Sequence, residues 1–307
     1  GLHHALTKYG TMTWQEVLEP SIKLAKEGFA VPHDLANILA SSRYKQRLSS
    51  NEAAARSYYK NDNSNYQAGE ILKLPDLAWT LNQLSVHGPD AFYKGEIAKK
   101  IVEEMERNGG LINADDLKNY RAVERIPVEG TYKNFRIVSM PPASSGGIHL
   151  IQMLNMIEEF PIKDMGFGSA DSIHILAEVM KRAYADRSKH LGDMDFYEVP
   201  FNLMSKDYSS FLNQSISVNS RTASKDVFAG DPYPYESPDT THFSVMDRYG
   251  NAVSNTYTLN FSYGSGIMIP GTGMLMNNEM DDFSSKPGVP NGYGLLGSEA
   301  NSIQANK

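Results

Sequence analysis

A β-hairpin is predicted near the end of the chain, and its turn leaves little freedom in how the two strands can pair. Residues 240–247 and 251–260 are rich in β-branched and aromatic side chains that alternate with polar ones, which is typical of strands. The three-residue loop between them ends in Gly250, and glycine accepts the left-handed conformation that such a loop requires. The turn therefore predicts the register, with Asp247 opposite Asn251.

Counting back along this register pairs Thr240 with Thr258. Directly opposed residues have Cβ atoms about 4.5–5.5 Å apart, so their two hydroxyls come within reach of a hydrogen bond. Asn260 lies two residues further along the strand, so its side chain is expected on the same face. The pattern predicts two hydroxyls and an amide at one end of the hairpin, although threonine pairs are also routine in ordinary sheets.

The sequence changes character at the start of this hairpin. Residues 1–239 read as mainly helical, with apolar side chains at spacings of three and four, whereas residues 240–307 read as β-rich with many glycine turns. We therefore predict an α+β fold with a helical first two-thirds and its main boundary between these two ranges.

Local signals predict individual helices. Thr13 and Glu16 form the pattern of a capping box, and the helix that follows should stop at Gly28. The longest helical pattern begins at Ser172. Residues 43–70 are polar and are predicted to form a long surface connection.

Composition excludes several classes of function. The net charge is −7, whereas nucleic-acid or anionic-membrane partners call for a basic surface. Cysteine is absent, which excludes disulfides, thiolate catalysis and cysteine-ligated zinc. The eight histidines show no ligand spacing, so we predict no metal and no cofactor. There is no run of eighteen apolar residues that would predict a membrane-spanning helix.

Four motifs, in order along the chain, resemble those of the bacterial γ-glutamyltransferase (γ-glutamyltranspeptidase) family. They are Pro141-Pro142-Ala143-Ser144-Ser145-Gly146-Gly147-Ile148-His149, Thr240-Thr241-His242-Phe243-Ser244-Val245, Thr256-Tyr257-Thr258-Leu259-Asn260 and Asn277-Asn278-Glu279-Met280-Asp281-Asp282-Phe283. Weaker support comes from Tyr184-Ala185-Asp186-Arg187-Ser188 and Lys8-Tyr9-Gly10-Thr11-Met12. The resemblance runs nearly from end to end.

The resemblance implies an N-terminal-nucleophile hydrolase fold, an αββα sandwich that is incomplete in this chain. It also implies a precursor that cuts itself between Asp239 and Thr240, although the family more often has an amide-bearing residue before the threonine. After the cut, Thr240 would carry both the nucleophilic hydroxyl and a free α-amino group. An α-amino group has a pKa of about 7.7–8.0, which suits the base that a hydroxyl nucleophile needs.

The other site residues follow from the same resemblance. Thr258 matches the threonine that orients the nucleophile, in agreement with the register. Asn260, Glu279 and Asp282 match residues that hold the α-amino and α-carboxylate groups of the substrate, and Tyr293 matches a lid residue. Without the motifs, the two acids would read as a solvated acidic turn and the tyrosine as a surface residue.

The implied substrates are γ-glutamyl compounds such as glutathione, with water or an amino acid as acceptor, in a periplasmic or secreted protein. We see no signal peptide in the chain, and no nucleic-acid or membrane partner is expected.

Comparison with the full-length family predicts that the chain is truncated at both ends. An arginine for the α-carboxylate would precede Gly1, and a serine pair and the oxyanion glycines would follow Lys307. Losing one oxyanion donor costs about 10²–10³ in kcat, so we expect the chain alone to be inactive. We expect its exposed strands to be covered by a chain with the missing segments or by a homodimer partner.

Two alternatives remain open from the sequence. The polypeptide could be a non-catalytic fragment that serves as a partner surface, which predicts an intact chain without turnover. It could also be a related acylase of the same fold, which predicts a preference for another acyl group.

Overall fold

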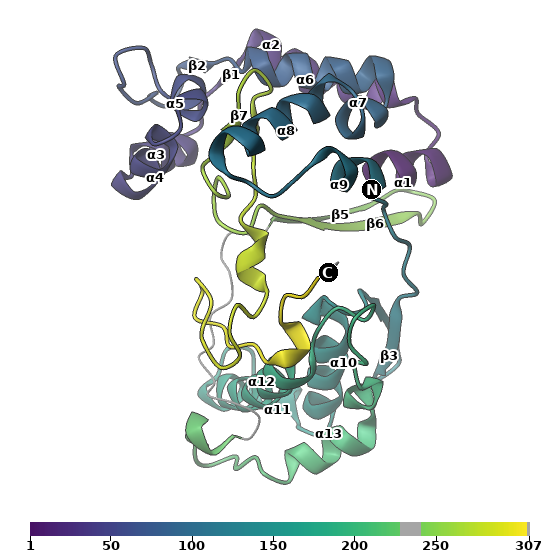
Figure 1. Ribbon diagram of the computed structural model, residues 1–307. Helices are drawn as coiled ribbons and strands as arrows, with labels where there is room; N and C mark the ends of the chain where they lie inside the picture. Colours follow the sequence, from purple (N-terminus) through teal and green to yellow (C-terminus); the bar gives the residue numbers. More distant parts are fainter. Residues whose placement is uncertain (228–240, 306–307) are drawn as a thin grey trace. The chain divides into compact units, whose positions relative to one another are not determined.

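The computed structural model describes residues 1–227 and 241–305, which form two compact units (Figure 1). Each unit combines segments from both sides of the predicted boundary: residues 1–123 with 241–278, and residues 124–227 with 279–305. The predicted division into residues 1–239 and 240–307 follows the expected cleavage point instead, and it stays a prediction.

The first unit is mainly helical, as the sequence predicts. Its helices are α1 (Leu2–Tyr9), α2 (Trp14–Glu27), α3 (His33–Ala40), α4 (Ser42–Ser49), α5 (Glu52–Tyr58), α6 (Pro75–His87), α7 (Asp90–Tyr93), α8 (Glu96–Asn108) and α9 (Ala114–Asn119). Its strands pair antiparallel as β1 (Phe29–Ala30) with β2 (Ile71–Leu72), β5 (Thr241–Met246) with β6 (Ala252–Tyr257), and β7 (Met268–Ile269) with β8 (Met274–Leu275).

The second unit has one hairpin and a group of helices around it. The hairpin pairs β3 (Val128–Tyr132) with β4 (Phe135–Ser139), and the α-helices are α10 (Ser145–Glu158), α11 (Ile162–Met165), α12 (Ala170–His190) and α13 (Lys206–Asn213). Short 3-10 segments are η1 (Phe201–Met204), η2 (Ser224–Asp226), η3 (Glu279–Asp282) and η4 (Glu299–Asn301). Among the helices of the described ranges, none has both the length and the apolar character needed to cross a membrane.

The predicted capping box at the start of α2 is confirmed. Thr13 Oγ1 accepts a hydrogen bond from the backbone N–H of Glu16 at 3.2 Å, and Glu16 Oε2 accepts one from the backbone N–H of Thr13 at 2.7 Å. This reciprocal pair provides partners for backbone donors that a helix start otherwise leaves to water. The helix ends at Glu27, directly before the predicted stop at Gly28.

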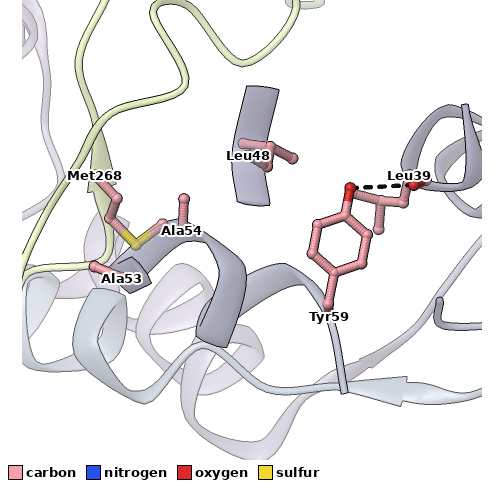
Figure 2. Close-up of a cluster of buried hydrophobic side chains, with 6 residues drawn as sticks. All are labelled: Leu39, Leu48, Ala53, Ala54, Tyr59 and Met268. Carbon is pink, nitrogen blue, oxygen red and sulfur yellow. Dashed lines mark hydrogen bonds between the residues drawn. The ribbon is translucent and has the colours of Figure 1, made fainter. Parts of the chain in front are cut away.

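The prediction of a surface connection over residues 43–70 is wrong for the first half of that range. Helices α4 and α5 lie there, and they contribute to a buried cluster of Leu39, Leu48, Ala53, Ala54, Tyr59 and Met268 (Figure 2). Each helix is short and turns only a narrow apolar side inward, so the polar residues on its outer sides dominate the sequence pattern. The hydroxyl of Tyr59 donates to the backbone oxygen of Leu39 at 3.1 Å, which provides a partner for the polar end of the buried ring.

The β5–β6 hairpin is confirmed together with its register. Thr241 pairs with Tyr257, and the later pairs follow the predicted count down to Asp247, whose backbone N–H donates to Asn251 O at 2.9 Å. Gly250 has a φ of +87°, the left-handed conformation that the loop requires. Local turn chemistry was therefore sufficient to predict how these two strands pair.

Strand β7 joins two apolar clusters of the first unit. Met268 belongs to the cluster in Figure 2, and Ile269 belongs to a second one with Ala91, Ile97 and Ile101. Adjacent side chains of a strand point to opposite sides, so one short strand can fill both clusters. Met268 is 1% exposed and Ile269 is 0% exposed, which places the β7–β8 hairpin in the core of the unit.

Helix α10 lies at the centre of the second unit. It begins at Ser145, where the Ser144 side chain accepts the backbone N–H of Gly146 at 3.1 Å and so caps the helix. Three of its buried apolar residues belong to two clusters: Ile148 and Ile151 pack with Val128, Leu191, Val199 and Leu203, while Met156 packs with Ile175, Val179 and Ala183 of α12.

Candidate active site

Thr258 and Asn260 lie in a tight turn directly after β6, in the first unit. The backbone N–H of Asn260 donates to Thr258 Oγ1 at 2.9 Å. This bond occupies one lone pair of the hydroxyl oxygen and leaves the hydroxyl hydrogen available to donate to another group. The sequence predicted a strand that continues to residue 260, but β6 ends at Tyr257. The structure brings the two residues together through a turn instead.

The side chain of Asn260 is buried and its amide orientation is fixed. Its backbone adopts a φ of +72°, a left-handed conformation that asparagine tolerates better than most residues. Its Nδ2 donates to the backbone oxygen of Asn278 at 3.1 Å. The amide nitrogen therefore lies on the Asn278 side and Oδ1 on the opposite side, and an amide oxygen is an acceptor suited to an ammonium group.

The predicted cleavage point, Asp239 and Thr240, lies outside the described residues. The confirmed register of β5–β6 ends at the pair of Thr241 with Tyr257. Extended by one further pair, it places Thr240 opposite Thr258, and this pairing stays a prediction.

The two predicted substrate acids line a cavity of about 260 Å³ in the second unit. Glu279 and Asp282 both belong to the single turn of η3, so they lie close together. Arg187 of α12 lines the same cavity. The remaining wall combines small polar with apolar side chains, among them Ser188, Leu191, Phe283, Ser284, Val289, Asn291, Leu295 and Asn301.

The carboxyl groups in this cavity have raised pKa values. Burial raises the pKa of Glu279, and the neighbouring charge of Asp282 raises it further. Partial burial also raises the pKa of the Asp282 carboxyl, an effect that the positive charge of Arg187 opposes. Burial lowers the pKa of Arg187, and electrostatic interactions with Tyr184 and Asp282 oppose this effect. Perturbed carboxyl groups in a cavity are typical of functional sites.

A buried network holds the segment of α12 that carries Arg187. The preceding residue, Asp186, accepts hydrogen bonds from Gln152 Nε2 at 2.5 Å and from the Tyr208 hydroxyl at 3.0 Å. Gln152 Oε1 accepts from His149 Nδ1 at 2.8 Å, which assigns the ring proton to Nδ1. Burial lowers the pKa of His149 to about 4, so the ring is neutral near pH 7. The network therefore ties α12 to α10 and α13.

A close approach between Gly297 and Ser284 shapes one wall of the cavity. Ser284 is 6% exposed, and its backbone N–H donates to Asn301 O at 2.9 Å. A Cβ atom on Gly297 would lie 2.0 Å from Ser284 Oγ, so any larger residue there would force Ser284 to move.

Tyr293 is not among the residues that line this cavity. The carboxylate of Asp281 accepts the backbone N–H of Gly292 at 2.9 and 3.1 Å, and Asn291 Oδ1 accepts that of Tyr293 at 3.0 Å. These bonds hold the Tyr293 loop against the acidic turn. The lid role of Tyr293 stays a prediction.

The predicted site residues thus fall into two groups, Thr258 with Asn260 in the first unit and Glu279 with Asp282 in the second. The sequence reasoning gave no role to Arg187 or to Asn278, although both lie in quoted motifs, because a linear motif does not show which neighbours its members contact. Over residues 1–227 and 241–305, no three histidine or acidic side chains gather closely enough to hold a metal ion.

The family described as Gamma-glutamyltranspeptidase matches residues 1–307. The chain is similar to the glutathione hydrolase proenzyme of Escherichia coli (strain K12), with 47% identity over 100% of this chain and 53% of that protein. It is also similar to the acylase ACY 1 proenzyme of Pseudomonas sp. (strain SE83), with 38% identity over 94% of this chain and 50% of that protein. The chain spans about half the length of these relatives.

The fold is similar to that in the crystal structure of Helicobacter pylori gamma-glutamyltranspeptidase, with a TM-score of 0.72 and 37% identity over 78% of this chain and 68% of that chain. This likeness confirms the predicted α+β fold class of the N-terminal-nucleophile hydrolases. The resemblance seen in the motifs is confirmed as well, and the chain belongs to the gamma-glutamyltranspeptidase family.

Proposed function

We propose that the protein is a γ-glutamyl amide hydrolase and transferase that cuts itself before Thr240. Family membership supports this proposal, and the proenzyme names of its relatives agree with self-cleavage. The observation that supports it most is the β5–β6 register, which ends at the pair of Thr241 with Tyr257. We propose that the pairing continues by one step, with Thr240 opposite Thr258. In that pairing the Thr258 hydroxyl, whose oxygen already accepts the Asn260 N–H, directs its hydrogen towards the nucleophile.

In the precursor, the Thr240 hydroxyl oxygen attacks the carbonyl carbon of Asp239. The peptide C–N bond breaks, an ester forms to the threonine oxygen, and the released nitrogen becomes the α-amino group of Thr240. Water then hydrolyses the ester, which leaves Asp239 with a carboxylate and Thr240 with a free hydroxyl. The attacking hydroxyl of Thr240 and the attacked carbonyl of Asp239 belong to adjacent residues. Strand pairing therefore has to orient only the Thr240 hydroxyl.

In the mature protein, the α-amino group of Thr240 takes the proton from its own hydroxyl as the oxygen attacks the γ-carbonyl carbon of the substrate. The amide C–N bond breaks, the amine leaves with a proton, and a γ-glutamyl ester remains on Thr240. Water or the amino group of an acceptor amino acid then attacks this ester and restores the hydroxyl.

The cavity acids are proposed to bind the α-ammonium group of the γ-glutamyl substrate. A carboxylate accepts charge-assisted hydrogen bonds from an ammonium. The same chemistry supports γ-glutamyl compounds such as glutathione as the substrate class. We further propose a periplasmic or secreted location, and a segment or partner chain that covers the exposed β5–β6 strands.

Replacing Asp282 by Asn is expected to raise KM for a γ-glutamyl anilide about 10–100-fold with little change in kcat, since a hydrogen bond to a charged group contributes about 1.5–3 kcal/mol. Because burial raises the pKa of Asp282, KM of the wild type should rise as pH falls through a value above the ordinary aspartate range near 3.9.

The pH dependence of KM, measured for both proteins, checks this prediction, and the acid limb should shrink in the Asp282→Asn variant. Asp207→Asn, which neutralises an exposed acid outside the cavity, is the control. An equal KM in Asp282→Asn and wild type would contradict ammonium binding at Asp282.

The proposed function is tested on the full-length protein by intact mass and by release of aniline from γ-glutamyl and other acyl anilides. Two pieces separated between Asp239 and Thr240, with turnover of the γ-glutamyl compound, are expected. A preference for another acyl anilide would favour an acylase, which the ACY 1 relative makes the second candidate. A single uncut species without turnover would contradict the proposed function and favour a non-catalytic polypeptide that serves as a partner surface.

A further inference from the structure

The turn that holds Thr258 is fastened to one residue, Asn278. Three consecutive residues bond to it: its backbone N–H donates to Leu259 O at 3.1 Å, its backbone oxygen accepts from Asn260 Nδ2 at 3.1 Å, and its side-chain Oδ1 accepts the backbone N–H of Phe261 at 3.0 Å. All of these residues belong to the first unit. Asn278 therefore holds residues 259–261 from both its main chain and its side chain.

Asn278 is itself placed by the buried β7–β8 hairpin. Beyond β8, the backbone N–H of Met276 donates to Ile267 O at 2.8 Å, and Met276 O accepts the N–H of Ser265 at 3.0 Å. These bonds continue the ladder of β7 with β8 towards Asn278. Since β7 lies in the core, the ladder gives Asn278 a rigid support, two residues beyond Met276.

We propose that Asn278 is a positioning residue, which transfers the rigidity of the core hairpin to the Thr258–Asn260 turn. The left-handed backbone of Asn260 still costs free energy for a residue other than glycine, so hydrogen bonds from its surroundings help to keep it. Asn278 restrains the backbone on both sides of Asn260, through its hydrogen bonds with Leu259 and Phe261. The Asn260 N–H that bonds the Thr258 hydroxyl is thereby fixed in direction.

This inference rests on the proposed function, in which the direction of the Thr258 hydroxyl matters for the reaction. The main-chain hydrogen bonds of Asn278 remain possible when its side chain is replaced by that of alanine or aspartate, so these substitutions test only the bond from Phe261 N–H to Oδ1. Asn278→Ala removes that acceptor, whereas Asn278→Asp keeps an oxygen in the same place. Comparing the two variants therefore distinguishes the effect of losing the hydrogen bond from the effect of changing the size of the side chain.

The test uses full-length protein with the variants Asn278→Ala and Asn278→Asp. Asn51→Ala is the matched control, because Asn51 Oδ1 accepts the backbone N–H of Ala54 at 2.9 Å in the same unit, at the start of α5. Asn278→Ala is expected to lower kcat for a γ-glutamyl anilide about 100-fold, as a small misplacement of a reacting group does. Asn278→Asp should recover most of this loss, and Asn51→Ala should lower Tm with kcat unchanged.

An equal kcat in Asn278→Ala and Asn51→Ala, at similar Tm, would overturn the proposal and leave Asn278 a purely structural residue. Hydrogen exchange of the Phe261 amide supplies a readout that needs no activity. If the wild type fails to release aniline, the proposed function fails, and exchange then decides only whether the Asn278 side chain holds the turn. Protection lost in Asn278→Ala and kept in Asn278→Asp would show that it does, and unchanged protection in both variants would refute the proposal at its first step.

Discussion

The Thr240→Ala variant of the full-length protein is expected to remain uncut and to turn over γ-glutamyl amides about 10⁶-fold more slowly than the wild type, the loss typical of a hydrolase without its nucleophile. Both effects have one physical cause in the proposed mechanism, where the same hydroxyl attacks the Asp239 carbonyl in the precursor and the substrate carbonyl afterwards. Intact mass measures the first effect, and aniline release measures the second.

Two further variants sharpen this result. Thr240→Ser keeps a hydroxyl and should still be cut, whereas Thr258→Ala should leave the nucleophile present but poorly oriented, with a smaller loss than Thr240→Ala. Cleavage at the same bond in Thr240→Ala would show that another group performs the attack. Cleavage at wild-type rate in that variant would also remove the reason to treat Thr240 as the nucleophile.

The second large effect concerns stability, where Glu178→Gln is expected to cost about 3–5 kcal/mol of unfolding free energy. Glu178 is 0% exposed, and its carboxylate lies 2.8 Å from Arg182 Nη1 and 2.6 Å from Lys181 Nζ. It also accepts the backbone N–H of Thr222 at 3.0 Å. The substitution removes the negative charge and leaves the buried Arg182 guanidinium, 3% exposed, without its counter-charge.

Urea unfolding of the two proteins measures this difference. The exposed pair of Lys99 with Glu103, 3.8 Å apart on α8, provides the control, and Glu103→Gln should change stability by less than about 1 kcal/mol. Adding Arg182→Ala to Glu178→Gln should restore part of the loss, since the unpaired charge is then removed. Equal stability of Glu178→Gln and Glu103→Gln would contradict a strong role for the buried pair.

The Glu178 contribution should also depend on pH. Burial by itself would raise the pKa of this carboxyl, but hydrogen bonds from Lys181, Arg182 and Thr222 together outweigh burial and lower the pKa from 4.5 to about 2. A carboxyl whose pKa is lower in the folded state stabilises that state above its unfolded pKa and loses this effect as pH falls. The difference between wild type and Glu178→Gln should therefore be full above about pH 4.5 and should disappear towards pH 2.

The hairpin shows where sequence reasoning was sufficient. Its register depends on a three-residue loop and on Gly250, and both act over a few neighbouring residues. The capping box at Thr13 and Glu16 is local in the same sense. Such features are predictable because the atoms that interact are close in the chain as well as in space.

For helices α4 and α5, sequence reasoning was not sufficient to predict the structure. Their polar composition predicts a surface segment, and they are held by contacts with Leu39 and with Met268, more than two hundred residues away along the chain. No local pattern shows that a distant methionine completes their core.

The sequence by itself determined the fold class, the hairpin register and the family. Only the tertiary structure decided that Arg187 lines the cavity of Glu279 and Asp282, and that Asn278 holds the turn after Thr258. The physical reason is that burial, hydrogen-bond partners and pKa values depend on which distant segments meet, and residue types and their spacing do not contain that information.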